Sequence, residues 1–159
     1  MPAPNARAEG VSEAAAAFAH TSADPYRPGA KARALLRGIQ IARHDLQESG
    51  GAFDLSQVTE LLGISRQAVD KKVKDDALLA VPGPNGQRRY PVAQFTEEGV
   101  VPGLRQVLAA LPSRNAWFRL NFLVNPDPHL DRRRPIDLLK AGQAALVVQA
   151  AGCVGQQGA

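Results

Sequence analysis

The stretch that decides the fold runs from residue 54 to residue 74: Asp54-Leu-Ser-Gln-Val-Thr-Glu-Leu-Leu-Gly-Ile-Ser-Arg-Gln-Ala-Val-Asp-Lys-Lys-Val-Lys74. Asp54 can cap a first helix, and Gln57, three residues later, completes a capping box. Gly63 can adopt the left-handed conformation that a sharp turn requires, and Ser65 can cap a second helix that ends near Lys74. The stretch therefore predicts two short helices joined by a tight turn.

The distribution of polar and apolar residues over this stretch is typical of a helix-turn-helix. Apolar residues fall where the two helices would touch, and polar residues fall on the outer face of the second helix. In DNA-binding proteins such a second helix enters the major groove, where Gln67 could pair with adenine and Arg66 with guanine. Ser65, Lys71 and Lys74 are better placed for phosphates. The predicted DNA contacts on this helix are Ser65, Arg66, Gln67, Asp70, Lys71 and Lys74, with Asp70 expected to tune specificity.

A basic hairpin is predicted directly after the two helices. Asn85 and Gly86 lie between two short extended runs, and an Asn-Gly pair in that position is the strongest local hairpin signal. The second run carries Arg88 and Arg89, which could reach the DNA backbone or an adjacent minor groove. We therefore predict a two-stranded wing whose DNA contacts are Arg88 and Arg89. The alternative interpretation is that these arginines and the polar helix face are ordinary solvated surface.

Composition narrows the class of protein. The chain has 159 residues, an apolar fraction of 45%, a formal net charge of +4 and one cysteine. A charge of this sign fits a polyanionic partner, although many proteins without one are equally basic. No run of apolar residues is long enough to cross a membrane, and no secretory signal precedes the fold. We expect a cytoplasmic protein without an internal disulfide.

No catalytic, metal or cofactor site is expected. His20, His44 and His129 lie in separate segments, with no nucleophile signature beside them. No cluster of Cys and His has the spacing of metal ligands, and no Gly-rich phosphate loop follows a strand. The sequence predicts a binding protein rather than an enzyme.

The remaining segments predict further helices around this centre. Apolar residues recur at helical spacing over residues 30–48, and shorter helices are expected at 102–111, 114–124, 135–142 and 143–151. The fold class is mainly α: a helix-turn-helix with a short β-hairpin wing, followed by a small C-terminal helical bundle. We expect flexible tails at 1–29 and 153–159, a DNA-binding region at 30–96 and a helical domain at 97–152.

The C-terminal segment resembles a known family. Residues 116–130, Ala116-Trp-Phe-Arg-Leu-Asn-Phe-Leu-Val-Asn-Pro-Asp-Pro-His-Leu130, precede Arg134-Pro-Ile-Asp-Leu-Leu-Lys-Ala-Gly142. This order of an aromatic helix, an Asn-Pro turn and a Pro-Ile-Asp-Leu-Leu helix resembles the toxin-binding domain of the Xre/MbcA/ParS antitoxins. The likeness covers residues 103–151. The chain departs from it at Asp131-Arg132-Arg133, where a Gly is common, and in its longer, winged central segment.

The resemblance implies an antitoxin that neutralises a RES-domain toxin directed at NAD and represses its own operon, acting as a homodimer or higher assembly. The residues implied in toxin binding are Asn125, Pro126, Leu130, Pro135, Asp137, Leu138, Gly142 and Cys153. For the helix from Pro135 to Gly142, the alternative is a capped helix that only completes a small core.

Two other functions remain open. One is a stand-alone transcription factor or excisionase-like architectural protein whose C-terminal module only oligomerises. The other is a protein-binding adaptor whose helix-turn-helix no longer contacts DNA. Salt-dependent DNA binding would separate the adaptor from the rest, because phosphate contacts release counterions.

Overall fold

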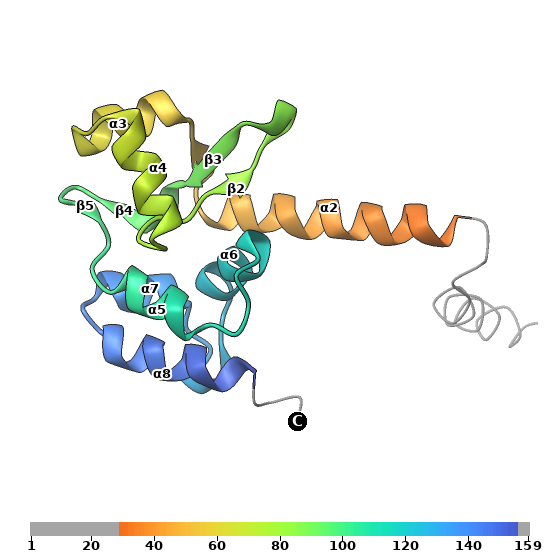
Figure 1. Cartoon of the computed structure of the whole chain (residues 1–159). Helices are drawn as coiled ribbons and strands as arrows, with labels where there is room; N and C mark the ends of the chain where they lie inside the picture. Colours follow the sequence, from red (N-terminus) through yellow and green to blue (C-terminus); the bar gives the residue numbers. More distant parts are fainter. Residues whose placement is uncertain (1–28, 156–159) are drawn as a thin grey trace, which may run out of the picture. The chain divides into compact units, whose positions relative to one another are not determined.

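The computed structural model describes residues 29–155, which are mainly helical with small antiparallel sheets (Figure 1). This confirms the predicted fold class. The expected tail at 1–29 lies almost wholly outside the described residues, as do the last four residues of the tail expected at 153–159. The described residues divide into two units between Ile41 and Ala42, and the division falls within the long helix α2 (Ala30–Glu48).

The helix-turn-helix forms as predicted. Helix α3 (Leu55–Leu62) begins at Asp54, whose side chain accepts from the Gln57 N–H while the Gln57 side chain accepts from the Asp54 N–H. Gly63 ends it in the left-handed region at φ 65°. Helix α4 (Arg66–Lys74) begins at Ser65, whose hydroxyl accepts from the Ala68 N–H. All four local signals in the sequence therefore act where they were expected.

The wing is a three-stranded sheet rather than an isolated hairpin. Strand β2 (Val81–Pro82) pairs antiparallel with β3 (Arg88–Pro91), as predicted. A 3-10 turn η1 (Pro84–Gly86) joins them, with Asn85 and Gly86 at positive φ angles of 60° and 75°. Strand β1 (Ala52–Phe53) completes the order β1-β3-β2, and the sequence did not predict it.

A second, smaller hairpin follows the wing. The 3-10 turn η2 (Val92–Gln94) leads into β4 (Phe95–Thr96), which pairs with β5 (Gly99–Val100). Gln94 is buried, and its amide bonds both the N–H and the C=O of Leu79 and the C=O of Pro91. One side chain thus replaces missing ladder hydrogen bonds between two segments.

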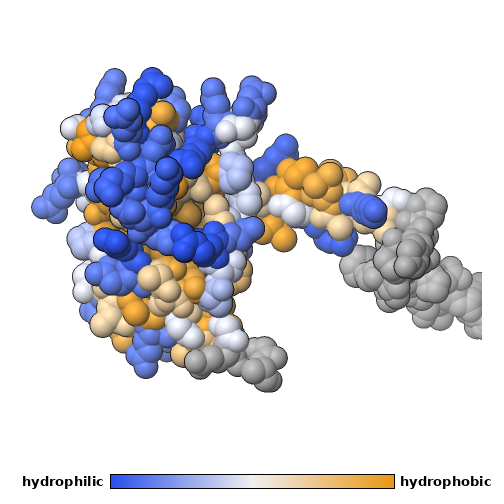
Figure 2. Space-filling view, in the orientation of Figure 1, coloured by the Kyte–Doolittle hydropathy of each residue, from blue (hydrophilic) through white to orange (hydrophobic). Residues whose placement is uncertain are grey.

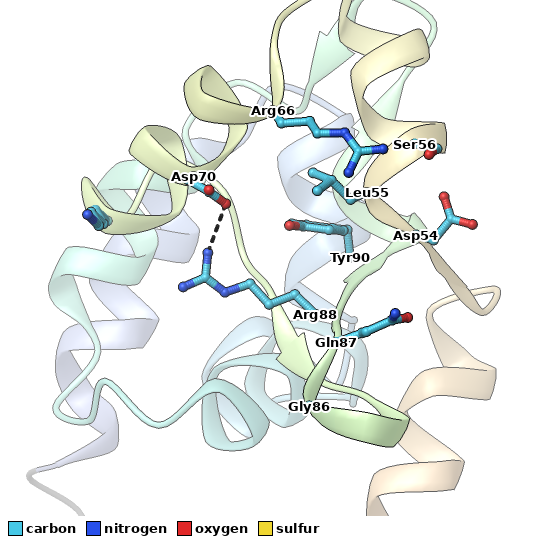
Figure 3. Close-up of a pocket in the computed structure, with 10 residues that line it drawn as sticks. Asp54, Leu55, Ser56, Arg66, Asp70, Gly86, Gln87, Arg88 and Tyr90 are labelled. Atoms are coloured by element: carbon cyan, nitrogen blue, oxygen red, sulfur yellow. Dashed lines mark hydrogen bonds and ion pairs between the residues drawn. The ribbon is translucent and has the colours of Figure 1, made fainter.

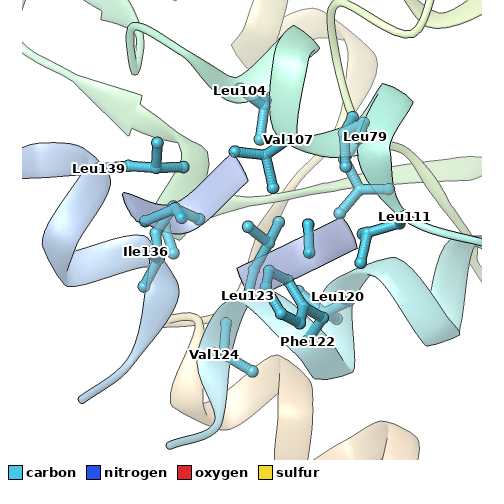
Figure 4. Close-up of a cluster of buried hydrophobic side chains, with 14 of the residues drawn as sticks. Leu79, Leu104, Val107, Leu111, Leu120, Phe122, Leu123, Val124, Ile136 and Leu139 are labelled. Atoms are coloured by element: carbon cyan, nitrogen blue, oxygen red, sulfur yellow. The ribbon is translucent and has the colours of Figure 1, made fainter. Parts of the chain in front are cut away.

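Four helices and a 3-10 turn form the C-terminal helical module: α5 (Leu104–Ala110), α6 (Ala116–Val124), η3 (Pro128–Leu130), α7 (Pro135–Lys140) and α8 (Ala144–Val154). Their buried faces meet in one core (Figure 4). Helix α5 begins two residues later than expected because Gly103 adopts φ 91°. Helix α8 runs further than expected, so Cys153 lies in a helix. No helix in residues 29–155 is long and apolar enough to cross a membrane.

Candidate nucleic-acid interface

Helix α4 presents a polar face anchored by an apolar one. Val69 is completely buried, whereas Arg66, Gln67, Asp70 and Lys71 are exposed. Val69 packs in a small core beneath the helix-turn-helix, and the other buried members of this core are Val58, Leu78, Tyr90 and Phe95. The orientation of the helix is therefore fixed by its buried side while its cations stay in solvent.

A polar cleft of about 600 Å³ lies between α4, the first turn of α3 and the wing (Figure 3). Arg66 and Asp70 reach it from α4, and Arg88 reaches it from β3. The close-up shows the Arg88 and Asp70 side chains directed toward each other across the cleft. The residues that line it are Asp54, Leu55, Ser56, Arg66, Asp70, Lys74, Gly86, Gln87, Arg88 and Tyr90.

The charges in the cleft are unevenly matched. Arg88 Nη1 lies 3.2 Å from Asp70 Oδ1, and both side chains are about half exposed. Among the described residues, Arg66 and Lys74 have no ion-pair partner. The cleft therefore carries two cations whose charge is not compensated by a contact, together with one arginine held by a carboxylate. Hydrophilic side chains also cover the face of this region that Figure 2 shows.

Tyr90 forms part of the cleft wall. Its side chain is 1% exposed, and burial raises the pKa of its phenol above the ordinary value of 10.0. The nearby Arg88 acts in the opposite direction and the nearby Asp70 in the same direction. The hydroxyl therefore keeps its proton at neutral pH.

The structure brings together part of the predicted DNA-binding set. Arg66, Asp70, Lys74 and Arg88 line the cleft, whereas Arg89 does not. Arg88 and Arg89 are consecutive in a strand, so their side chains alternate between its two faces. Arg89 packs over Gly83, where an added Cβ would lie 2.6 Å from the Arg89 Cγ.

The remaining predicted contacts lie on α4 outside the cleft. Gln67 and Lys71 are exposed, and Lys71 pairs with Asp75 at 3.4 Å. Ser65 is exposed, although its hydroxyl is already used as a cap. The sequence analysis did not single out Ser56 and Gln87, which also line the cleft. Ser56 could have been found, because the first helix of a helix-turn-helix crosses the DNA backbone.

The predicted toxin-binding residues divide into a buried and an accessible group. Leu130, Pro135 and Leu138 are buried in the C-terminal module. Their side chains hold the core together and offer no surface in this fold. The accessible residues of the set are Asn125, Pro126, Asp137, Gly142 and Cys153.

Two of the accessible residues lie at a hollow on the C-terminal module. Asn125 and Pro126 border a depression of about 170 Å³, together with the exposed edge of Phe118. Asn125 is also tied to α2, because its amide donates to the buried Asp45 carboxylate at 2.8 Å. The other lining residues are Asn121, Phe122, Asp127 and Val154.

Among solved structures, the chain resembles the NMR structure of Rv2175c, with a TM-score of 0.56 and 31% sequence identity. The match covers 64% of this chain and 79% of that chain. This chain belongs to the same family as Rv2175c.

The extent of the match to Rv2175c also bears on the architecture. The match covers 64% of this chain, which is more residues than either the winged helix-turn-helix or the C-terminal module contains by itself. No protein-family model and no curated protein match the chain. Residues 29–155 also contain no group of His, Cys, Asp and Glu that could hold a metal ion.

Proposed function

We propose that this protein is a regulator that binds double-stranded DNA through its winged helix-turn-helix. The observation that carries the proposal is the convergence of Arg66, Lys74 and Arg88, from two separate elements, on one polar cleft beside an exposed helix. A solvated surface helix needs no such convergence. The protein acts in this proposal as a binding protein in the cytoplasm rather than as an enzyme.

The proposed complex assigns a role to each exposed side chain. Helix α4 lies in the major groove, where Gln67 and Arg66 meet base edges near its N-terminus. Lys71 and Lys74, one and two turns later, meet phosphates and set the register. Arg88 leads the wing toward the adjacent backbone. Asp70 opposes phosphate contact, which restricts the poses that α4 can take.

The experiment begins with selection of bound duplexes from a random library, followed by titration of the best duplex at several salt concentrations. Lys74→Ala should weaken binding to all duplexes alike and lower the salt slope by about one unit. The matched control is Lys140→Ala, an exposed lysine of α7 outside the cleft. Gln67→Ala should relax the preference at one base pair, at a cost of about 1–3 kcal/mol.

Two outcomes would contradict the proposed DNA-binding function. Equal effects of Lys74→Ala and Lys140→Ala would mean that binding follows net charge alone, which contradicts the proposed interface. Absence of any salt-dependent DNA binding would favour the adaptor function instead.

A second candidate function is neutralisation of a RES-domain toxin by the C-terminal module. The observation that favours it is the hollow bordered by Asn125, Pro126 and the exposed edge of Phe118, since exposed aromatic surface beside a depression suits a protein partner. Within this proposal the buried residues Leu130 and Leu138 support the surface without touching the toxin.

Co-purification with a RES-domain protein encoded beside the gene tests this candidate. Phe118→Ser should lose the partner while α6 stays folded, because the side chain is 36% exposed. Leu146→Ser is the matched control, since Leu146 is 42% exposed on α8 and does not border the hollow. Capture that is insensitive to Phe118→Ser would exclude the hollow as the toxin contact.

A further inference from the structure

Helix α2 carries an apolar stripe that the described residues do not cover. Leu35 is 66% exposed, Leu36 is 56% exposed and Ile39 is 41% exposed. Figure 2 shows hydrophobic side chains gathered on α2 beside hydrophilic ones. Three large aliphatic side chains on one side of a helix are an unfavourable surface to leave in water, because burial of apolar area stabilises a protein.

The spacing of the stripe indicates what covers it. Ala32, Leu35, Ile39, Ala42 and Leu46 follow one another at alternating steps of three and four residues. This spacing is that of a two-stranded coiled-coil seam, in which Ala32 and Ile39 would take a positions and Leu35 and Ala42 would take d positions. The C-terminal end of this row of residues is not available to a partner, because Leu46 packs against the larger core.

The charges on α2 are compatible with a parallel pair of such helices. From Ala30 to His44 the helix contains Lys31, Arg33, Arg37 and Arg43 and no carboxylate. In a parallel in-register pair, a g residue faces the e residue of the next heptad in the partner. Across the two helices, Lys31 then neighbours Leu36 of the second copy, and Gly38 neighbours Arg43, so no cation faces another. Arg33 and Arg37 occupy b and f positions, away from the seam.

We propose that the stripe of α2 is covered by the same stripe of a second copy of this chain, in a parallel two-stranded coiled coil. The role of this dimer rests on the proposed DNA-binding function: two copies would present two recognition helices to the two halves of one DNA site. Two heptads make a short seam, so the pair is weak in solution and becomes tighter when both copies bind one duplex.

Disulfide cross-linking tests the pairing directly, because Cys153 is the one cysteine of the chain. In a Cys153→Ser background, single cysteines are introduced by Leu35→Cys and Ile39→Cys on the seam, and by Arg37→Cys on the opposite side. The proposal expects rapid covalent dimers from both seam variants and little from Arg37→Cys. An antiparallel pair would bring together at most one of the two seam positions with itself, so cross-linking of only one would overturn the parallel arrangement.

Sedimentation equilibrium of the uncross-linked protein gives an independent measure, using two exposed isoleucines on different sides of the helix. Ile39→Asp should weaken dimerisation at least about tenfold, because it places a charge in the seam. Ile41→Asp should have little effect, because Ile41 lies outside the seam and is 55% exposed. Added salt should strengthen the dimer by screening the four cations on each helix, whereas it weakens DNA binding.

The results separate this proposal from the function it serves. Seam-specific cross-linking without DNA binding would leave the dimer in place and remove the proposed function. DNA binding without seam-specific cross-linking would overturn the dimer. Binding to anionic lipid vesicles that Ile39→Asp abolishes, with no seam cross-links, would show that the stripe faces a membrane and that the proposal is wrong.

Discussion

The winged helix-turn-helix and the C-terminal helical module differ in the size of their hydrophobic cores and in the surface that each exposes. Beneath α3 and α4 lies a small core around Val58, Val69 and Tyr90, covered by an exposed, cation-rich surface. The C-terminal module has the larger core, and that core extends into the wing segment through Leu79, Val81 and Ala93. The candidate binding surface therefore lies on the region with the smaller core, the winged helix-turn-helix. We expect packing against the C-terminal module to stabilise this region.

The largest loss of stability is expected from a substitution in the larger core, that of the C-terminal module. Leu120→Ala removes a side chain that is 1% exposed and should lower the free energy of unfolding by about 3–4 kcal/mol. Val58→Ala in the small core should cost less, about 2 kcal/mol, because fewer atoms are removed. Urea unfolding followed by circular dichroism measures both. A single transition is expected in each variant; two separated transitions would show that the regions are stable independently.

The next effect concerns the ion pair that joins the two regions. Arg119 of α6 is 6% exposed, donates to Asp76 at 2.9 Å, and also donates to the carbonyl oxygens of Ser113 and Leu108. Asp76 lies two residues beyond the end of α4, so Arg119 connects this end of α4 to the C-terminal module. Arg119→Ala should cost about 2–3 kcal/mol, because it leaves acceptors without their donor.

Arg114→Ala is the matched control for Arg119→Ala. Arg114 pairs with the same carboxylate at 3.1 Å, but its side chain is 75% exposed. Its loss should change the free energy of unfolding by less than about 0.5 kcal/mol. Equal costs for the two variants would mean that burial does not set the strength of this connection.

The sequence predicted the helix-turn-helix closely and the connection not at all, for a physical reason. Asp54, Gly63 and Ser65 act within one turn of their own helices, so their effects are visible in a short window. Arg119 and Asp76 are 43 residues apart, and no local pattern pairs them. The two-residue strands β1, β4 and β5 were missed because so short a segment has no periodicity to detect.

The candidate interface was predicted in the same uneven way. The exposed face of α4 follows from helical periodicity, which places Val69 inside and Arg66 and Asp70 outside. The separation of Arg88 from Arg89 depends on which face of β3 meets the cleft, and the sequence around them does not show this. Likewise, Leu130 and Leu138 belong to a recognisable segment whose burial only the packed fold reveals.

Two glycines provide a third, smaller contrast between the regions. Both have positive φ, but an added Cβ at Gly103 would lie 2.6 Å from the Ala144 Cβ, whereas at Gly63 nothing lies within 4 Å. Gly63→Ala should therefore cost about 1 kcal/mol, from backbone strain alone. Gly103→Ala adds the clash of α5 with α8 and should cost about 2–3 kcal/mol. Thermal unfolding of both variants tests whether the module is the more tightly packed region; equal losses would contradict it.

Acid should weaken the connection between the regions. The hydrogen bond from Arg119, helped by the charges of Arg119, Arg114 and Arg105, holds the pKa of Asp76 below its ordinary value of 3.8. A carboxyl group with a lowered pKa stabilises the fold above its unfolded pKa, and this contribution is lost as the pH falls through the folded pKa. Stability measured from pH 7 down to pH 2 should lose this contribution below about pH 4. In Asp76→Asn that part of the acid loss should be absent; an unchanged acid profile would contradict the assignment.

A small change in stability is expected from substitution of Asp70, together with a larger change in the affinity for DNA. Asp70 and Arg88 are both about half exposed, so Asp70→Asn should change the free energy of unfolding by less than about 0.5 kcal/mol. The same substitution releases Arg88 and removes a negative charge from the cleft, so affinity for DNA phosphates should rise severalfold at low salt. Asp75→Asn is the control, since Asp75 pairs with Lys71 outside the cleft. We therefore expect the buried pair of Arg119 and Asp76 to act on stability, and the exposed pair of Arg88 and Asp70 to act on the proposed DNA binding. An Asp70→Asn variant that is markedly less stable, yet binds DNA unchanged, would reverse that assignment.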